Sequence, residues 1–428
     1  MVTAIVLIIE IMALIFLKAL GINERPAEMI LVMIAAGSVA YIFDINRDEN
    51  LQVVELPLVL GLFLRLAFLL VDIFGKGIIT LPNSGADTEM FYRMAVSYSE
   101  GVTNIRGGGF FVITLGTLFK LIGVTRLYAQ FLLIICSLVA LLNCDLIMRE
   151  YAVSFRGRLT TMTMLCLMPN FAILSSILLR ESIVVMLSSI SLLFFSRWIK
   201  NDSEGEFIIG MLFAMFSMRF HSGMIGLLLA YLLVRVVYNK KKDTISITVG
   251  NVISTFLILI GVIYFLNTNR ILYLGKFLNI DTLEDLAVVG ETGGSSYSQF
   301  VGNSNSLRNI AVYTLPRMVF FMFSPFPFQW RGAADIIAFV FSSLLYLIII
   351  IRVIRSIKFS SDNKNYLILF SIIAFTTMLV FAWGTVNSGT AIRHRDKMVV
   401  LFGVLLGLTF ERNAENTGIN KRYSQYLK

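Results

Sequence analysis

Residues 125–147 read TRLYAQFLLIICSLVALLNCDLI, an apolar run in which only Arg126 and Asp145 carry charge. The hydrocarbon core of a bilayer is about 30 Å thick, and an α-helix needs about 20 apolar residues to cross it. Similar runs recur along the chain of 428 residues, of which 57% are hydrophobic and 15% charged. Soluble domains are about 45–50% apolar and about 25% charged. The composition therefore indicates a membrane protein that crosses the bilayer many times.

The apolar runs predict an all-α, polytopic membrane helix bundle of about 12 spans. Two more apolar stretches, 109–123 and 309–328, are ambiguous and are treated below. The predicted spans are 1–20, 27–44, 52–74, 125–147, 159–178, 182–199, 206–219, 223–238, 245–266, 333–352, 366–384 and 398–411.

Basic residues cluster between several of these spans, and such clusters favour the cytoplasmic side. All clusters fall on one side if 109–123 and 309–328 are interfacial or re-entrant rather than spanning. Both chain termini are then cytoplasmic. Re-entrant backbone survives at membrane depth only beside protein or a water-filled cavity, so this topology predicts a cavity on the outer side. The clusters are Arg149/Arg156/Arg158, Arg197/Lys200, Lys240/Lys241/Lys242, Arg352/Arg355/Lys358 and Lys421/Arg422.

The chain has no low-complexity linker, so we expect a single membrane domain over residues 1–428. Three segments lie outside the membrane in this topology: 75–124, 267–308 and 385–397. Long loops in compact domains are usually functional or disordered. The middle segment mixes leucine and aromatic residues with its glycines, which favours order. We expect the three outer segments to form the active-site face.

Several other classes of protein are disfavoured. The formal net charge of +9 is explained by basic loops that face anionic lipid, so no nucleic-acid partner is expected. The cysteines Cys136, Cys144 and Cys166 lie in apolar runs without a CxxC motif, which disfavours a disulfide or metal site. No Walker A, GxSxG, HExxH or GxGxxG motif of the required context occurs. The energy for any reaction or transport by this chain must then come from the substrate or from a gradient.

Short outer hairpins carry charges where charge is costly. Arg180 and Glu181 lie between two apolar runs, and they either face the bundle or form a solvated tip. Arg219 and His221 lie in the similar hairpin 217–223. His221 is either a proton carrier or a hydrogen-bonded structural residue. Arginine suits buried or interfacial anion binding because its planar fork pairs phosphate oxygens bidentately.

The run Arg393-His394-Arg395 precedes the last predicted span on its outer side. At a helix N-terminus, guanidinium charge, free N–H groups and the helix dipole would together form an anion site. The alternative is a basic juxtamembrane cluster, although such clusters belong on the cytoplasmic side.

Asp87 and Glu89 lie where the first outer segment enters a predicted helix. Asp87 is either the N-cap of that helix or a carboxylate in the outer cavity. A carboxylate there can act as general base or orient an acceptor hydroxyl.

The order of these features resembles the GT-C superfamily of integral-membrane glycosyltransferases, which take sugars from polyprenyl-phosphate carriers. The C-terminal features are more similar to Wzy-type polymerases of O-antigen and capsule repeat units. The resemblance covers roughly residues 80–200 and 290–400. The matching residues are Asp87-x-x-x-Phe91-Tyr92, Gly109-Phe110-Phe111, Leu178-Leu179-Arg180-Glu181-Ser182, Gly294-Ser295-Ser296-Tyr297, Ser324-Pro325-Phe326-Pro327-Phe328 and Gly389-Thr390-Ala391-Ile392-Arg393-His394-Arg395.

The resemblance implies a multi-pass enzyme of the bacterial cytoplasmic membrane that polymerises saccharides linked to undecaprenyl pyrophosphate on the outer face. Asp87 and Glu89 would be the catalytic carboxylates. No cofactor is required, although the two carboxylates leave a divalent cation as an option. A flippase and a chain-length regulator are expected partners, besides membrane lipid. The leaving diphosphate would be held by Arg180, Arg219, His221, Arg308, Arg393, His394 and Arg395.

Two alternatives stay open. One is a GT-C transferase that moves a single sugar from polyprenyl monophosphate, which differs from a polymerase in product length. The other is a flippase or transporter of lipid-linked saccharides. A transporter would need an internal repeat and broken helices at the membrane midplane, and the two halves of the sequence show no convincing repeat.

Overall fold

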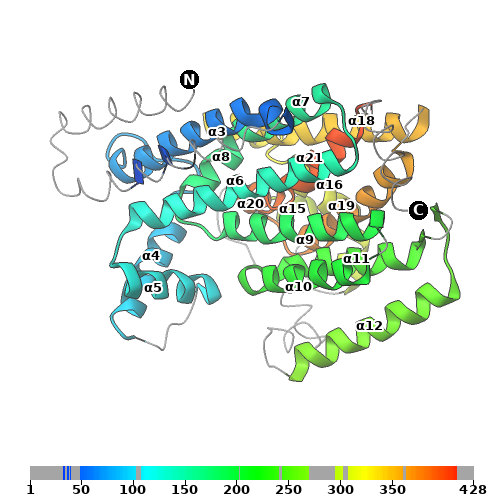
Figure 1. Cartoon of the computed structure of the whole chain (residues 1–428). Helices are drawn as coiled ribbons and strands as arrows, with labels where there is room; N and C mark the ends of the chain where they lie inside the picture. The colour runs from blue at the N-terminus through cyan, green and yellow to red at the C-terminus, as the bar shows by residue number, and fades with distance from the viewer. Residues whose placement is uncertain are drawn as a thin grey trace. The chain divides into compact units, whose positions relative to one another are not determined.

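The computed structural model describes residues 32–33, 36–37, 39, 49–102, 108–201, 203–240, 243–268, 295–301, 307–359 and 363–411. Within these ranges the chain is almost entirely helical, which confirms the all-α prediction (Figure 1). The predicted span 1–20, most of 27–44 and most of the outer segment 267–308 lie outside the described residues. The chain divides into two compact units, which are described separately here.

The first unit comprises Met1–Leu141 and Arg158–Ser182. Its described helices are α3 (Glu49–Phe74), α4 (Ala86–Ser99), α5 (Gly109–Ile122), the first part of α6 (Arg126–Glu150), α7 (Phe155–Leu167) and α8 (Pro169–Ser176).

The second unit comprises Leu142–Gly157 and Ile183–Lys428. A two-residue antiparallel ladder pairs Tyr238 with Ile245 and Asn239 with Thr244. Its described elements, besides the end of α6, are α9 (Glu181–Asn201), α10 (Glu204–Phe220), η1 (Ser222–Met224), α11 (Ile225–Val237), β1 (Tyr238–Asn239), β2 (Thr244–Ile245), α12 (Val249–Thr268), α15 (Ser298–Val301), α16 (Leu307–Phe323), η3 (Pro327–Gln329), α17 (Ala333–Ala338), the π-helix η4 (Phe339–Leu344), α18 (Leu345–Phe359), α19 (Lys364–Trp383), α20 (Ser388–Asp396) and α21 (Val399–Leu408).

The described residues hold 5 helices that are long and apolar enough to cross a membrane. Counting the bent pair of α7 and α8 as one span raises the number to 6. The protein is therefore an α-helical membrane protein. The larger number of spans expected from the sequence stays a prediction. The 5 helices are Gln52–Phe74, Arg126–Glu150, Glu181–Asn201, Ala333–Phe359 and Lys364–Trp383.

Two predicted spans differ in the structure. The run 159–178 is not one straight helix, because it bends by 53° between α7 and α8. Pro169 explains the break, since proline has no N–H to continue the ladder and its ring clashes with the preceding turn. The run 398–411 contains only the 10 residues of α21. At 1.5 Å per residue that helix is about 15 Å long, roughly half the hydrocarbon thickness.

Both ambiguous stretches form helices that are too short to count as spans. Residues 109–123 become α5, and 309–328 contains most of α16. In the first unit, α5 packs against α4 (Figure 1), with a T-shaped contact between Phe91 and Phe111 at 5.3 Å. The sequence-based interpretation of both stretches as interfacial or re-entrant remains compatible with these lengths.

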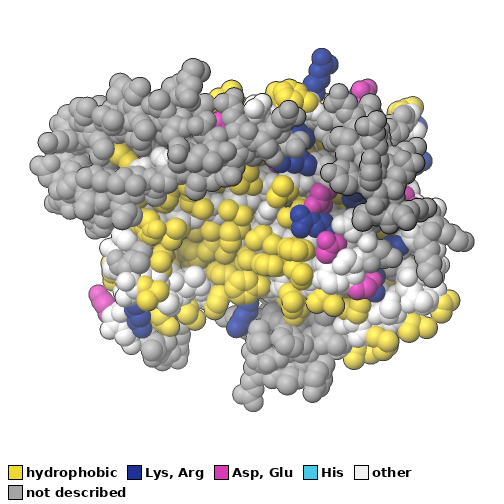
Figure 2. Space-filling model, in the orientation of Figure 1, with side chains coloured by type: hydrophobic (Ala, Val, Ile, Leu, Met, Phe, Trp, Pro, Cys, Tyr) yellow, Lys and Arg dark blue, Asp and Glu magenta, His cyan; other side chains and the backbone are white. Residues whose placement is uncertain are grey.

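The second unit has a dense aromatic and aliphatic interior. The rings of Phe195 on α9 and Tyr231 on α11 stack at 3.8 Å. Helix α11 lies against α19, and Gly226 makes this close approach possible because a Cβ there would lie 3.0 Å from Thr377 Cα. Part of the exposed surface is also apolar and includes Phe256, Leu257 and Val312. Figure 2 shows hydrophobic side chains over much of the face in view, as expected for a surface in contact with lipid tails.

Candidate functional site

A buried carboxylate organises the polar cluster of the first unit. Asp72, near the end of α3, is 2% exposed. Its carboxylate accepts hydrogen bonds from the Ser84 hydroxyl, from Gln130 Nε2 at 2.7 Å and from Arg126 Nη2 at 3.3 Å. The ion pair offsets the cost of burying the carboxylate, and the two further hydrogen bonds satisfy its remaining lone pairs. Asp72 therefore fixes the start of α6 and the loop before α4 to the end of α3.

Arg126 extends this cluster to Glu89 on α4. Its Nη1 donates to Glu89 Oε1 at 2.7 Å, and Lys76 pairs with the same oxygen. Burial raises the pKa of Glu89, but the hydrogen bonds and charges of Lys76 and Arg126 outweigh this and leave the pKa below its ordinary value. Glu89 is thus held as an anion by two cations, and a carboxylate in that state is a poor proton acceptor.

Asp87 has a different environment from Glu89. It is the second residue of α4 and its side chain is exposed. It is not the N-cap, a position that Gly85 occupies. Thr88 instead exchanges hydrogen bonds with the backbone of Gly85, at 3.1 and 3.0 Å. Asp87 therefore lies in the first turn, where the positive end of the helix dipole stabilises its charge.

Arg180 belongs to the same unit as these carboxylates. It lies half-buried between α8 and α9, directly before the buried Glu181. Its predicted role in holding a diphosphate stays a prediction.

In the second unit the two histidines of the chain meet. His221 Nε2 and His394 Nε2 are 3.1 Å apart, although 173 residues separate them in the sequence. The ring of Phe381 on α19 contacts both imidazoles, with centroids at 5.4 and 5.2 Å. His394 Nδ1 also lies 3.0 Å from Thr385 Oγ1. The turn between α10 and α11 is thereby joined to α20.

The Arg393-His394-Arg395 motif lies at the opposite end of its helix from the one predicted. It occupies the last turn of α20, and Lys397 is the C-cap. The N-terminus is capped by Asn387, whose side chain accepts from Gly389 N at 2.9 Å and Thr390 N at 3.3 Å. The N–H groups and the positive dipole end of α20 therefore do not contribute to an anion site at this motif, and that part of the prediction is wrong. Basic residues in the last turn instead complement the negative end of the dipole.

Arg395 has a structural environment. It is 0% exposed, and its Nη1 donates to the carbonyl oxygens of Phe321 at 3.2 Å and Met322 at 2.6 Å and to Ser343 Oγ at 3.2 Å. Burial lowers the pKa of Arg395 to about 10, against the charge of Asp396, which raises it. The guanidinium therefore stays charged at neutral pH and attaches α20 to the end of α16 and to the π-helix η4.

The remaining predicted arginines differ in exposure. Arg393 is half-buried, and Arg219 near the end of α10 is exposed. Along the chain, Arg219 lies two residues before His221, and Arg393 lies directly before His394. Arg308 lies in the first turn of α16, and its side chain is outside the described part of the structure. Arg219 and Arg393 are the partly solvent-accessible cations of this cluster.

A short segment of the predicted loop 267–308 packs against α20. Ser296 pairs with Asn387 in an isolated antiparallel bridge, and Tyr297 N donates to the carbonyl of Val386 at 2.8 Å. The buried Tyr297 hydroxyl donates to the carbonyl of Thr385 at 3.1 Å. Burial raises the pKa of Tyr297, so the phenol remains a donor. These contacts place residues 295–301 beside the histidine pair.

Several residues of these clusters were not predicted from the sequence. They are Lys76, Arg126, Gln130, Thr385 and Arg317, which donates to the carbonyls of Val301 and Trp383. A charged residue inside an apolar run was the available signal for Arg126 and Arg317. Thr385 carries no such signal, because a threonine at a helix end is common.

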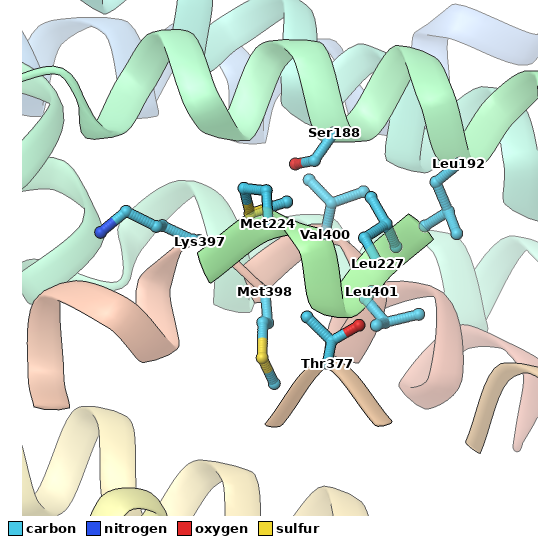
Figure 3. A pocket seen from close by; sticks show the side chains of 9 residues that line it. All are labelled: Ser188, Leu192, Met224, Leu227, Thr377, Lys397, Met398, Val400 and Leu401. Atoms are coloured by element: carbon cyan, nitrogen blue, oxygen red, sulfur yellow. The ribbon is translucent and has the colours of Figure 1, made fainter. Parts of the chain in front are cut away.

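The second unit also contains a small cavity of about 20 Å³ between α9, α11, α19 and the start of α21. Figure 3 shows Leu227, Val400 and Leu401 lining it, while the Lys397 side chain extends away from them. This volume accommodates about one water molecule. The cavity is too small to hold a saccharide.

No group of three His, Cys, Asp or Glu side chains suited to a metal ion occurs among the residues that the structure describes. The optional cation of the sequence analysis would have to compete with Lys76 and Arg126 for Glu89. No protein-family model, curated protein or solved structure matches the chain. The function must therefore be argued from the residues themselves.

Proposed function

We propose that the protein is a glycosyltransferase of cell-surface polysaccharide assembly in the bacterial inner membrane. It joins oligosaccharide repeat units carried on undecaprenyl pyrophosphate, on the outer face. The chain is a single GT-C-like membrane domain of about 12 spans with both termini in the cytoplasm. Its partners are the lipid-linked saccharides, with a flippase before it and a chain-length regulator beside it.

One observation carries this proposal. The histidine pair brings together two segments that are distant in the sequence, and an arginine that is not buried lies close to each histidine along the chain: Arg219 two residues before His221, and Arg393 directly before His394. Guanidinium groups in such a place can bind the anionic group of a substrate. Arginine rather than lysine at both places suits the planar oxygens of a phosphate.

The reaction needs a group that accepts a proton and a group that stabilises the leaving diphosphate. The acceptor hydroxyl oxygen bonds to the anomeric carbon of the donor saccharide, and the bond from that carbon to the phosphate oxygen breaks. The diphosphate leaves with the electron pair, and the hydroxyl proton passes to a carboxylate. In the first unit Asp87 is better suited than Glu89 to take this proton, because two cations already hold Glu89. In the second unit Arg219 and Arg393 stabilise the charge of the leaving group.

The test is transfer by the purified protein in proteoliposomes supplied with an undecaprenyl-pyrophosphate-linked oligosaccharide. A ladder of products supports a polymerase. One added sugar supports the single-sugar transferase instead, and movement across the bilayer without a new glycosidic bond supports a flippase.

Two substitutions sharpen the test. Asp87→Asn should lower transfer about 10²–10⁴-fold, as expected for loss of a general base. Arg393→Lys should lower it about 10²-fold, because lysine lacks the two parallel donors. Arg331→Lys is the matched control, since Arg331 is exposed and faces Asp335 at 3.8 Å. Full transfer by both Asp87→Asn and Arg393→Lys would refute these roles.

A further inference from the structure

Four hydrogen bonds run in series through the histidine pair. The backbone N–H of Gly223 donates to His221 Nδ1 at 3.2 Å. His221 Nε2 and His394 Nε2 are 3.1 Å apart, and His394 Nδ1 is 3.0 Å from Thr385 Oγ1. The Thr385 hydroxyl donates its hydrogen to the carbonyl of Phe381 at 2.7 Å. Both ends of the series are backbone groups, whose roles as donor and acceptor are fixed.

These fixed ends determine where the protons lie. Gly223 N–H can only donate, so His221 Nδ1 has no proton and His221 carries its proton on Nε2. Thr385 uses its single hydrogen toward Phe381, so its oxygen must accept from His394 Nδ1–H. His394 Nε2 is then the acceptor for His221 Nε2–H. The two rings are therefore different tautomers, and both are neutral.

An additional proton has no place in this arrangement. On His221 Nδ1 it would meet the Gly223 N–H, and on His394 Nε2 it would meet His221 Nε2–H. Either position breaks one of the four hydrogen bonds. Imidazole is also the side chain whose charge ordinarily changes between pH 5 and 8. The arrangement with two neutral rings is therefore expected in the upper part of that pH range.

The surroundings also oppose an added positive charge. Helix α10 contributes Arg219, α16 contributes Arg317 and the 295–301 segment contributes the neutral Tyr297. Near the pair, α19 contributes the apolar ring of Phe381. Helix α20 and its C-cap contribute Arg393, Arg395 and Lys397 against the single carboxylate of Asp396. Among these described residues the cations outnumber the anions.

The packing around the pair leaves little room for the two rings to rearrange. A Cβ at residue 223 would lie 2.5 Å from the Phe381 ring and 3.1 Å from His221 Nδ1. Glycine at this position therefore permits the turn to approach both rings. Breaking a hydrogen bond of the pair is then expected to move the turn away from α20.

We propose that the His221–His394 pair is a neutral, proton-sensitive contact that positions the Arg219 segment against the Arg393 segment and separates them when it takes up one proton. The contact itself follows from the hydrogen bonds above. Its role as a pH control of diphosphate binding rests on the proposed function. His221 and His394 are in this sense positioning residues.

Nuclear magnetic resonance of ¹⁵N-histidine-labelled protein tests the proton positions directly, without any substrate. The chain has only two histidines, so a purification tag without histidine leaves four ring nitrogens to observe. At pH 8 we expect one ring protonated on Nε2 and the other on Nδ1, with a scalar coupling across the N–H···N bond. Two rings of the same tautomer, or a charged ring at pH 8, would overturn the proposal.

Thr385 supplies a matched pair of variants. Thr385→Ser keeps the hydroxyl and should preserve both tautomers. Thr385→Val removes the acceptor, so His394 should no longer be held in the tautomer that carries its proton on Nδ1. Identical spectra for the two variants would contradict the series of hydrogen bonds.

The pH response provides a second, independent measurement. The unfolded chain binds more protons than the neutral pair below the imidazole range, so stability must fall as pH falls. Wild-type protein should lose several degrees of thermal stability from pH 8 to pH 5.5, and the coupling should disappear over the same interval. His394→Gln, which keeps an acceptor but cannot take up the proton, should show a smaller loss. A coupling that persists at pH 5.5 would exclude the proton-sensitive role.

These measurements separate this proposal from the proposed function. If the tautomers and the pH response are as expected but no saccharide is transferred, the contact stands and the glycosyltransferase assignment fails. If transfer occurs and the two rings share one tautomer, only the contact is refuted.

Discussion

Arg65 Nη1 donates to the main-chain carbonyl of Cys166 across 2.8 Å, and its Nε donates to Ser175 Oγ across 2.9 Å. Cys166 lies in the last turn of α7 and Ser175 lies in α8, so one side chain of α3 contacts both sides of the break at Pro169. The carbonyls of the last turn of α7 lack their helical partners there. The buried guanidinium supplies a donor in their place.

We expect Arg65→Met to destabilise the protein by about 1.5–3 kcal/mol, the usual value of a hydrogen bond from a charged donor. Methionine fills most of the volume but leaves the Cys166 carbonyl without this donor. Thermal unfolding in detergent measures the change. Arg93→Met is the control because Arg93 is exposed on α4. Equal unfolding temperatures for the two variants would show that Arg65 does not stabilise the break.

Asp72 and Arg126 should be energetically coupled. In a double-mutant cycle with Asp72→Asn and Arg126→Met, the interaction free energy should lie within about 0.5–3 kcal/mol, because both side chains share one buried network. The exposed pair of Arg331 and Asp335 provides the comparison, for which about 0–1 kcal/mol is expected. Additive effects at Asp72 and Arg126 would argue against the network.

Glu89 should make stability depend on pH. Its pKa is below the ordinary value in the folded protein, so its stabilising effect is complete above about pH 4.5 and is lost as pH falls through the folded pKa. The side chain is 39% exposed, so solvent screening limits the effect to about 0.2–1 kcal/mol. Glu89→Gln should therefore lower the unfolding temperature at pH 7, and the difference should close as the pH falls through the folded pKa of Glu89. The exposed Glu100 supplies the control substitution Glu100→Gln.

Gly226 should not tolerate a methyl group. A Cβ there would lie 3.0 Å from Thr377 Cα and from Val380 Cβ. Because backbone must move to admit it, Gly226→Ala should cost about 1–3 kcal/mol, more than the gain in helix propensity. Gly250→Ala, with no atom within 4 Å of the added Cβ, should be neutral or stabilising. Unfolding curves of the two variants in the same detergent decide the matter.

Arg395→Lys and Arg393→Lys should separate folding from binding. Lysine at 395 cannot reach the Phe321 and Met322 carbonyls and Ser343 together, so we expect a loss of about 1.5–3 kcal/mol in stability. Arg393→Lys should leave the unfolding temperature nearly unchanged and lower transfer. If the Arg395→Lys protein is as stable as the wild type but inactive, Arg395 binds the substrate rather than stabilising the fold.

Local sequence signals located most of the helices and some of the functional candidates. The apolar runs 52–74 and 125–147 became α3 and α6, whose bounds are Glu49–Phe74 and Arg126–Glu150. The residues just before the Arg393 motif also indicate where its helix begins, but the motif was assigned to the wrong end of that helix. Asn387 followed by Ser388 is a strong N-cap signal, and it places the motif in the last turn of α20 rather than the first.

The sequence by itself determined that the chain is an α-helical membrane protein, because twenty apolar residues in a row leave the backbone no other partner than its own helix. It did not determine which polar side chains meet. The sequence did not show that Asp72 meets Gln130, that Arg65 meets Cys166 or that His221 meets His394, because the members of each pair lie on different elements of the fold. Only packing of the helices decides those contacts, since a buried charge or imidazole has to take whichever partner the neighbouring helix presents.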